Sequence, residues 1–166
     1  MARPWTADDI PDQTGRTALV TGANSGIGFE TAKELARKEA HVVMACRGPH
    51  KARGAADAIR EDVPHASLEL IDLDLADLAS VQAFADAFRE SHQRLDLLIN
   101  TAGIMMTPYG ATADGFEQQF GTNHLGHFAL TGLLIDPILA APGARVVNVS
   151  SGGHRMGSMD FDNLQY

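Results

Sequence analysis

Five short apolar runs alternate with stretches of helical periodicity along this chain. The runs predict strands at residues 16–21, 41–46, 67–72, 95–100 and 144–150. Each run is nearly continuous in apolar residues, which is typical of strands that are buried on both faces of a parallel sheet. The pattern therefore predicts an α/β fold in which helices cover both faces of one sheet.

The segments between the runs carry the apolar spacing of helices. A first helix is expected after the strand at 16–21, and a second is expected to begin at Pro49 and to end before Pro64. Asp77 is the predicted cap of a third helix, whose apolar stripe consists of Leu78, Val81, Phe84, Ala85 and Phe88. A longer helical region is predicted over residues 112–139. It is weakened or interrupted by Gly121, Gly126, Gly132 and Pro137, and a break near Gly121 that gives two helices is expected.

Right-handed crossovers between successive strands predict a Rossmann-like doubly wound parallel sheet, with the order 3-2-1-4-5 and three α/β/α layers in the part present. A ligand is expected at the carboxyl ends of the strands, at the switch between the first and the fourth. Residues 15–166 are interpreted as one domain. Residues 1–14 predict an irregular lead-in, in which Trp5 and Ile10 are expected to anchor against the domain.

The composition narrows the classes of function. The 166 residues carry a formal net charge of −8, with no cluster of Lys or Arg, which argues against nucleic acid or an anionic membrane surface as a partner. The apolar runs are too short to span a membrane, and no secretory signal is visible. Cys46 is the only cysteine, so it forms neither an intrachain disulfide nor a cysteine metal cluster. A cytoplasmic protein is expected.

The stretch Thr21–Gly28 reads Thr-Gly-Ala-Asn-Ser-Gly-Ile-Gly, and it lies between the first predicted strand and the first helix. Glycines let the backbone approach a pyrophosphate closely, and the helix N-terminus adds free N–H groups and a partial positive charge. The spacing differs from the Gly-x-Gly-x-x-Gly fingerprint, and a glycine turn without a ligand is the alternative. The candidate coenzyme-binding residues here are Gly22, Asn24, Ser25, Gly26, Ile27 and Gly28.

Four later motifs follow in order along the chain. They are Asp72-Leu73, Asn100-Thr101-Ala102-Gly103, Asn123-His124-Leu125-Gly126-His127-Phe128 and Val147-Asn148-Val149-Ser150-Ser151. With the glycine turn, they resemble the short-chain dehydrogenase/reductase family over residues 15–156, and the third motif resembles its retinol-dehydrogenase-like branch. The resemblance implies an oxidoreductase that transfers hydride between NADP(H) and a small alcohol or carbonyl substrate. A non-catalytic nucleotide-binding fragment or module is the alternative.

Arg47 bears on the choice of coenzyme. An acidic residue at the end of the second strand would hold the ribose 2′-hydroxyl of NAD, but the chain has Cys46 and Arg47 there. A guanidinium pairs well with a 2′-phosphate, which favours NADP over NAD. Arg53 is the alternative partner for that phosphate.

The resemblance implies further coenzyme contacts at the ends of the later strands. The residues concerned are Asp72, Leu73, Asn100, Ala102 and Gly103. Asp72 is expected to accept a hydrogen bond from the adenine amino group, although helix capping is an alternative for this carboxylate. Thr101 replaces the second asparagine of the family motif, and it lacks the paired donor and acceptor of an amide.

Catalytic roles are implied for Asn123 and Ser151. Asn123 matches the asparagine of the family's catalytic tetrad, which holds a water in a proton relay through a local helix distortion; an ordinary polar helix residue is the alternative. Ser151 matches the serine that orients and polarises a substrate carbonyl, with Ser150 or a plain strand end as alternatives. His124 and His127 are spaced as a metal pair, but no further ligand has suitable spacing, so packing histidines and no metal site are predicted.

The family mechanism also needs a tyrosine and a lysine spaced Tyr-x-x-x-Lys, and this sequence does not contain that motif. The interpretation is truncation before the motif, so that residues 15–166 form a partial dinucleotide-binding domain that is incomplete at the C-terminus. Tyr166 is an alternative catalytic tyrosine, separated from its lysine. The chain is therefore expected to expose a sheet edge, to be marginally stable and to lack turnover alone. Homo-oligomerisation of a full-length form stays open.

Overall fold

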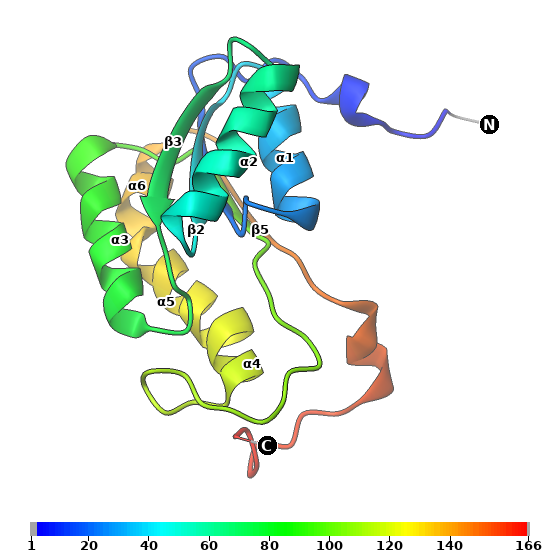
Figure 1. Cartoon of the computed structure of the whole chain (residues 1–166), viewed down its shortest axis with the longest axis vertical. Helices are drawn as coiled ribbons and strands as arrows, with labels where there is room; N and C mark the ends of the chain where they lie inside the picture. Colours follow the sequence, from blue (N-terminus) through cyan, green and yellow to red (C-terminus); the bar gives the residue numbers. More distant parts are fainter. Residues whose placement is uncertain (1–2, 166) are drawn as a thin grey trace.

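A parallel five-stranded sheet in the order β3-β2-β1-β4-β5 forms the centre of the computed structural model, which describes residues 3–165 (Figure 1). The strands are β1 (Thr17–Thr21), β2 (His41–Cys46), β3 (Ser67–Asp72), β4 (Leu97–Asn100) and β5 (Arg145–Asn148). The predicted strand order and the Rossmann-like α/β class are confirmed. β4 begins later than predicted because the Leu95 N–H donates to the carbonyl of Pro137 rather than to a strand.

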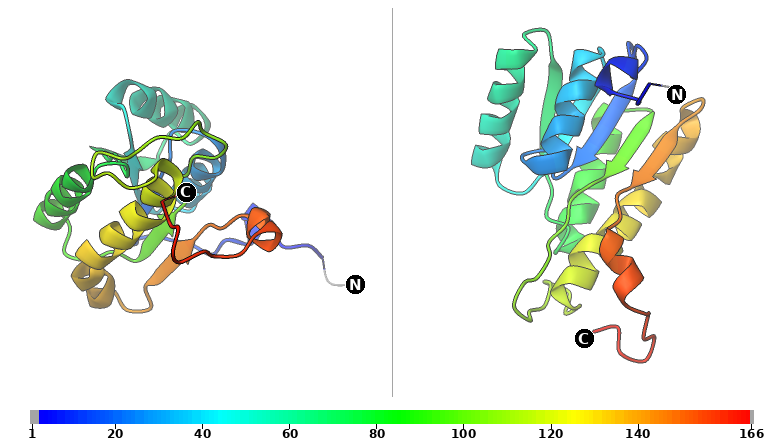
Figure 2. Two further views of the ribbon diagram at one scale, coloured as in Figure 1. Left: turned by 90° about the horizontal axis from the view of Figure 1, so that it is seen from below. Right: turned by 90° about the vertical axis from the view of Figure 1, so that its right-hand side faces the viewer.

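Helices pack on both faces of this sheet. They are α1 (Gly26–Arg37), α2 (Pro49–Asp62), α3 (Leu78–Ser91), α4 (Gln118–Phe120), α5 (Gly126–Leu133) and α6 (Ile135–Ala140), with a π-helical turn η2 (Gly121–Leu125) between α4 and α5. Short 3₁₀ helices are η1 (Ala7–Asp9) and η3 (Gly152–Met156). α1 and α2 lie on one face, and α3, α5 and α6 lie on the other (Figure 1, Figure 2).

Successive residues of β1 explain why the core has two sides. Ala18 and Val20 pack with apolar side chains of α1 and α2, whereas Leu19 packs with Phe84 and Phe88 of α3. All five side chains are buried. Full burial of a large apolar side chain stabilises a fold by roughly 1.5–3 kcal/mol. A continuous apolar strand is therefore stabilised from both faces at once.

The helical region predicted over residues 112–139 begins later than expected. Residues 112–117 form a turn in which the Thr112 N–H donates to the Phe116 carbonyl (2.8 Å), and the Glu117 side chain caps α4. The predicted break near Gly121 is wrong, because α4, η2 and α5 follow one another without interruption. A Cβ at Gly121 would collide with the Thr112 side chain, so glycine is needed there for close packing.

The interruption lies instead between α5 and α6, at Leu134. Pro137 has no N–H to donate to the carbonyl of Leu133, four residues before it. That carbonyl accepts a hydrogen bond from the Arg89 guanidinium of α3 (3.1 Å). The Leu133 carbonyl that is left free at the break therefore links the end of α5 to α3.

The N-terminal lead-in is held to the domain by Gln13. This residue is buried, and its N–H donates to the carbonyl of Lys38 at the end of α1 (2.8 Å). Trp5 is 70% exposed, so the anchoring predicted for it is wrong, whereas Ile10 is half-buried. Residues 1 and 2 of the predicted lead-in lie outside the described residues.

β5 forms an open edge of the sheet. It pairs with β4, and its residues Val146 and Val147 are 37% and 45% exposed. Figure 2 shows the chain continuing from β5 through η3, beyond the carboxyl end of the sheet. The expected open edge is thus present in the part of the chain that the structure describes. Within residues 3–165, no helix has the length and apolar character needed to cross a membrane.

Candidate functional site

A cavity of about 780 Å³ lies at the carboxyl ends of β1, β2 and β4, beside the N-terminus of α1. The predicted coenzyme-binding residues that line it are Gly22, Asn24, Ser25, Ile27, Gly28, Arg47, Leu73, Ala102 and Gly103. Gly26, Asp72 and Asn100 lie outside this lining. The fold therefore brings together most of a set that the sequence spreads from residue 22 to residue 103.

Backbone atoms of the turn between β1 and α1 form one wall of this cavity. Gly22 has a φ of +67°, which favours glycine. Gly28 stands against the Gly22 peptide, so a Cβ on Gly28 would lie 2.8 Å from the Gly22 carbonyl carbon. Ser25 is the N-cap residue of α1, and Ile27 in the first helical turn lines the cavity. N–H groups without intrahelical partners and the positive end of the helix dipole therefore lie at the wall.

Thr21 links this turn to the loop after β4, a role that the motif does not indicate. Its hydroxyl oxygen accepts the N–H groups of Thr101 (2.9 Å) and Ala102 (3.0 Å). The same oxygen lies 2.9 Å from Nε2 of His127. Nδ1 of His127 donates to the Asn123 carbonyl (2.9 Å), so Nε2 accepts and the Thr21 hydroxyl donates. One hydroxyl thus connects β1, the loop after β4 and α5.

His127 is a packing histidine, and burial keeps it neutral. Burial lowers the pKa of His127, and this effect outweighs the hydrogen bond to the Asn123 carbonyl, which raises it. His124 is exposed and stacks with Phe120 and Phe128, at ring-centroid distances of 5.3 and 6.4 Å. The two histidines that are spaced as a metal pair therefore make unrelated contacts.

Two cations stand beside the cavity where β2 ends and α2 begins. Arg47 has a side chain that is 72% exposed, and its Nη1 lies 3.5 Å from a carboxylate oxygen of Asp74. Lys51 lies in the first turn of α2 and also lines the cavity, although it was not among the predicted residues. Arg53, the predicted alternative to Arg47, lies outside the lining. Arg47 and Lys51 therefore place two cations at the rim, where the carboxylates of Asp74 and Asp77 also line the cavity.

Asp72 does not adopt the alternative role of a helix cap. Its carboxylate accepts the N–H of Gly48 (3.1 Å) at the turn after β2, while Asp77 caps α3 by accepting the N–H of Ala79 (2.9 Å). Leu73 is buried and lines the cavity. The adenine contact of Asp72 stays a prediction.

Cys46 is a further residue of the cavity wall that no motif indicated. Burial raises the pKa of its thiol to about 11, and the nearby carboxylate of Asp72 adds to the rise. The thiol is therefore protonated and unreactive at neutral pH.

A second cavity of about 690 Å³ adjoins the first, and Ala102 and Gly103 line both. Its other lining residues include Asn100, Asn123, Ser150 and Ser151. The two predicted catalytic residues, Asn123 and Ser151, thus lie around one space next to the first cavity.

Asn123 lies in the π-helical turn. The resemblance implies a local helix distortion at this residue, and the π-helical turn is such a distortion. Its side-chain oxygen accepts the N–H of Ile104, and its side-chain nitrogen donates to the Ile104 carbonyl, both at 2.8 Å. Asn123 therefore fixes the loop after β4. Asn100 donates to the side-chain oxygens of Asn148 (2.7 Å) and Thr131 (3.2 Å), so it joins β4 to β5 and α5.

Ser150 and Ser151 follow β5 and both line the second cavity. The hydroxyl oxygen of Ser151 accepts the N–H of Gly153 (3.1 Å) at the start of η3. The choice between the two serines stays open. Tyr166, the alternative catalytic tyrosine, lies outside the described residues.

These features define a Rossmann-like nucleotide-binding domain, with its cavity at the carboxyl edge of a parallel sheet and at the switch between β1 and β4. The model of the short chain dehydrogenase family matches residues 16–162. The chain therefore belongs to the short-chain dehydrogenase/reductase family, which is a family of oxidoreductases.

Retinol dehydrogenase 12 of Mus musculus is 49% identical to this chain, over 91% of this chain and 48% of its own length. Similarities of this kind confirm the retinol-dehydrogenase-like branch, and they do not favour the non-catalytic alternative. The chain spans about half the length of the curated relatives it matches, which is consistent with the predicted truncation.

Two solved structures share the fold. The crystal structure of an uncharacterized protein from Mycobacterium Paratuberculosis has a TM-score of 0.84 and 47% identity, and the match covers 97% of this chain and 55% of that chain. A short chain dehydrogenase from Escherichia coli CFT073, complexed with NADPH, has a TM-score of 0.75 and 29% identity, covering 89% of this chain and 65% of that chain. The Rossmann-like sheet is thus common to this chain and its relatives.

Proposed function

We propose that this chain is the coenzyme-binding part of an NADP(H)-dependent oxidoreductase that acts on a small alcohol or carbonyl substrate. The observation that carries the proposal is the β1–α1 turn, where a side chain on Gly28 would collide with the Gly22 peptide beside the cavity. A pyrophosphate fits this cradle, because unpaired N–H groups and the helix dipole stabilise its negative charge. The bound coenzyme supplies or accepts the hydride.

The rim at the end of β2 supports NADP(H) rather than NAD(H). β2 ends at Cys46, a position without a carboxylate to hold a ribose 2′-hydroxyl. Arg47 and Lys51 place two cations beside the cavity, and a guanidinium pairs with a phosphate through two N–H donors. The NADPH in the Escherichia coli relative supports the same choice.

The second cavity is the proposed place of the substrate, because it adjoins the first and is lined by the candidate catalytic residues. The Ser151 hydroxyl is proposed to donate to the substrate oxygen and so polarise the carbonyl, with Ser150 as the alternative. Asn123 is the proposed member of a proton relay. The 166 residues contain no Tyr-x-x-x-Lys to exchange a proton with the substrate, so we expect coenzyme binding without turnover by this chain.

Calorimetric titration with NADPH and NADH tests the choice of coenzyme. Arg47→Gln removes a charge-assisted contact worth about 1.5–3 kcal/mol, so the affinity for NADPH is expected to fall about 10- to 150-fold while that for NADH is unchanged. Arg53→Gln is the matched control, since Arg53 lies outside the cavity lining. A folded sample that binds neither coenzyme contradicts the proposed function. Equal losses in the two variants contradict the role of Arg47.

A further inference from the structure

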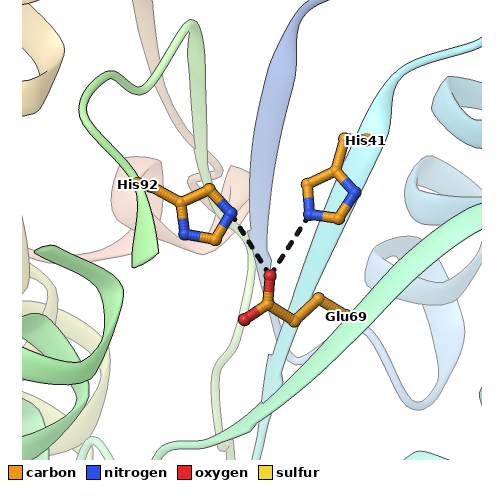
Figure 3. A group of neighbouring side chains, drawn as sticks. All are labelled: His41, Glu69 and His92. Carbon is orange, nitrogen blue, oxygen red and sulfur yellow. Dashed lines mark hydrogen bonds and ion pairs between the residues drawn. The ribbon is translucent and has the colours of Figure 1, made fainter. Parts of the chain in front are cut away.

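Three side chains from separate elements meet at the end of the sheet remote from the coenzyme cavity (Figure 3). His41 is the first residue of β2, Glu69 lies in β3, and His92 directly follows α3. One carboxylate oxygen of Glu69, Oε2, lies 3.2 Å from Nε2 of His41 and 3.2 Å from Nε2 of His92. The cavity-lining end of β2, by contrast, is at Ala45 and Cys46.

Both imidazole rings are held so that the same nitrogen faces the carboxylate. Nδ1 of His41 lies 2.8 Å from the hydroxyl of Ser67, and Nδ1 of His92 lies 2.9 Å from the hydroxyl of Ser91. The His92 ring also stacks on Phe88, with ring centroids 4.5 Å apart. A hydrogen bond on the outer nitrogen that leaves the inner nitrogen free to bind is the arrangement of metal-binding histidines.

The hydrogen bonds of Ser91 favour a cation between His92 and Glu69. The Ser91 hydroxyl has one proton, which it donates to the carbonyl of Ala87 at 3.0 Å. For both hydrogen bonds of Ser91 to form together, Nδ1 of His92 carries a proton and donates it to the Ser91 hydroxyl. A neutral His92 ring in that tautomer directs the lone pair of Nε2 at the Glu69 carboxylate. A positive charge between these two acceptors turns this repulsion into attraction.

We propose that Nε2 of His41, Oε2 of Glu69 and Nε2 of His92 bind one Zn²⁺ ion, with water at the fourth position. Two imidazoles and one carboxylate are ligands that Zn²⁺ prefers, whereas Mg²⁺ and Ca²⁺ prefer oxygen alone. Tetrahedral ligands at zinc bond lengths of about 2.0–2.1 Å lie about 3.3 Å from one another. The two N–O separations of 3.2 Å agree with this spacing.

The exposure of the cluster suits such a site. The side chains of His41 and Glu69 are each 33% exposed and that of His92 is 12% exposed, so the ion has a path from solvent. The bound ion joins β2, the edge strand β3 and the end of α3. Because it binds the native arrangement of these elements, it stabilises the fold and is independent of the coenzyme cavity.

Calorimetric titration of the metal-free chain with Zn²⁺ tests the proposal, and far-UV circular dichroism checks that each variant is folded. We expect one equivalent of Zn²⁺ to bind, and Glu69→Gln and His92→Asn each to lower the affinity at least about 10-fold. Ser67→Ala, which removes the partner of an outer nitrogen, is expected to lower it about 10- to 100-fold. His65→Asn is the matched control, because His65 pairs with Glu39 nearby and outside the cluster.

A second measurement needs no variant. Zn²⁺ is expected to raise the thermal midpoint of the unmodified chain, and Mg²⁺ is expected to leave it unchanged. The proposal is overturned if Zn²⁺ at about 100 µM neither binds nor shifts the midpoint. It is equally overturned if Glu69→Gln and His92→Asn, both folded, bind Zn²⁺ as the unmodified chain does.

Discussion

Replacing Gly28 by alanine tests how tightly the β1–α1 turn is packed. The new Cβ would lie 2.8 Å from the carbonyl carbon of Gly22 and 3.1 Å from the carbonyl oxygen of Thr21, and it would collide with the carbonyl oxygen of Gly22. All three are backbone atoms, so no side-chain rotation relieves the contact. Overpacking of this kind lowers the free energy of unfolding by about 1–3 kcal/mol. In a chain of this length the thermal midpoint falls by about 2–12 °C.

Gly54→Ala is the control for the same chemical change. Gly54 lies inside α2, and no atom lies within 4 Å of the place its Cβ would take. Alanine is favoured over glycine in a helix by roughly 0.5–1 kcal/mol, so the midpoint is expected to rise by about 1–4 °C. Circular dichroism measures both midpoints, and calorimetry measures NADPH affinity, which only Gly28→Ala is expected to lower, by at least about 10-fold. A Gly28→Ala variant with unchanged midpoint and unchanged affinity refutes the reasoning.

Three further predictions concern buried groups near the cavity. Thr21→Val leaves the N–H groups of Thr101 and Ala102 without their acceptor, so urea unfolding should show a loss of about 1–3 kcal/mol, and a loss below about 0.5 kcal/mol would count against this network. The folded chain has a lowered pKa at His127, so the unfolded chain gains a proton first as the pH falls below 6.5, and stability declines there by up to about 1.4 kcal/mol per pH unit. His127→Gln should remove the part of this pH-dependent loss of stability that His127 causes. Urea unfolding at a series of pH values measures it. The Cys46 thiol, with its pKa raised to about 11, should resist alkylation at neutral pH in the folded chain and react once urea unfolds it, as mass spectrometry can measure.

The order of the elements could be predicted from the sequence because its signals are local. The apolar runs give β2 and β3 with the observed bounds, and Asp77 caps α3 as expected. The errors arise where a distant residue decides the local structure. Glycine disfavours a helix, yet Gly121 is helical and leaves room for the Thr112 side chain, a contact that the local sequence does not indicate. The break at Leu134, by contrast, has a local cause in Pro137, and the fold adds only the Arg89 guanidinium that donates to the freed Leu133 carbonyl.

The candidate site was predictable to the extent that residue type fixes geometry. A glycine turn before a helix needs positive φ angles and close backbone contacts that other residues do not allow. Gly22 has such a φ angle, and Gly28 makes such a contact. Partners, by contrast, depend on the fold. The sequence does not indicate that Thr21 meets His127, or that Asp72 accepts from Gly48 instead of capping a helix.

The open side of β5 makes the behaviour of this chain depend on its concentration. Among the described residues, the backbone groups along that side pair with no further strand, and pairing with a strand of another chain would satisfy them while covering Val146 and Val147. Encounters between two chains increase with the square of concentration, whereas folding of one chain does not. Pairing between chains through β5 is therefore expected to weaken as the chain is diluted.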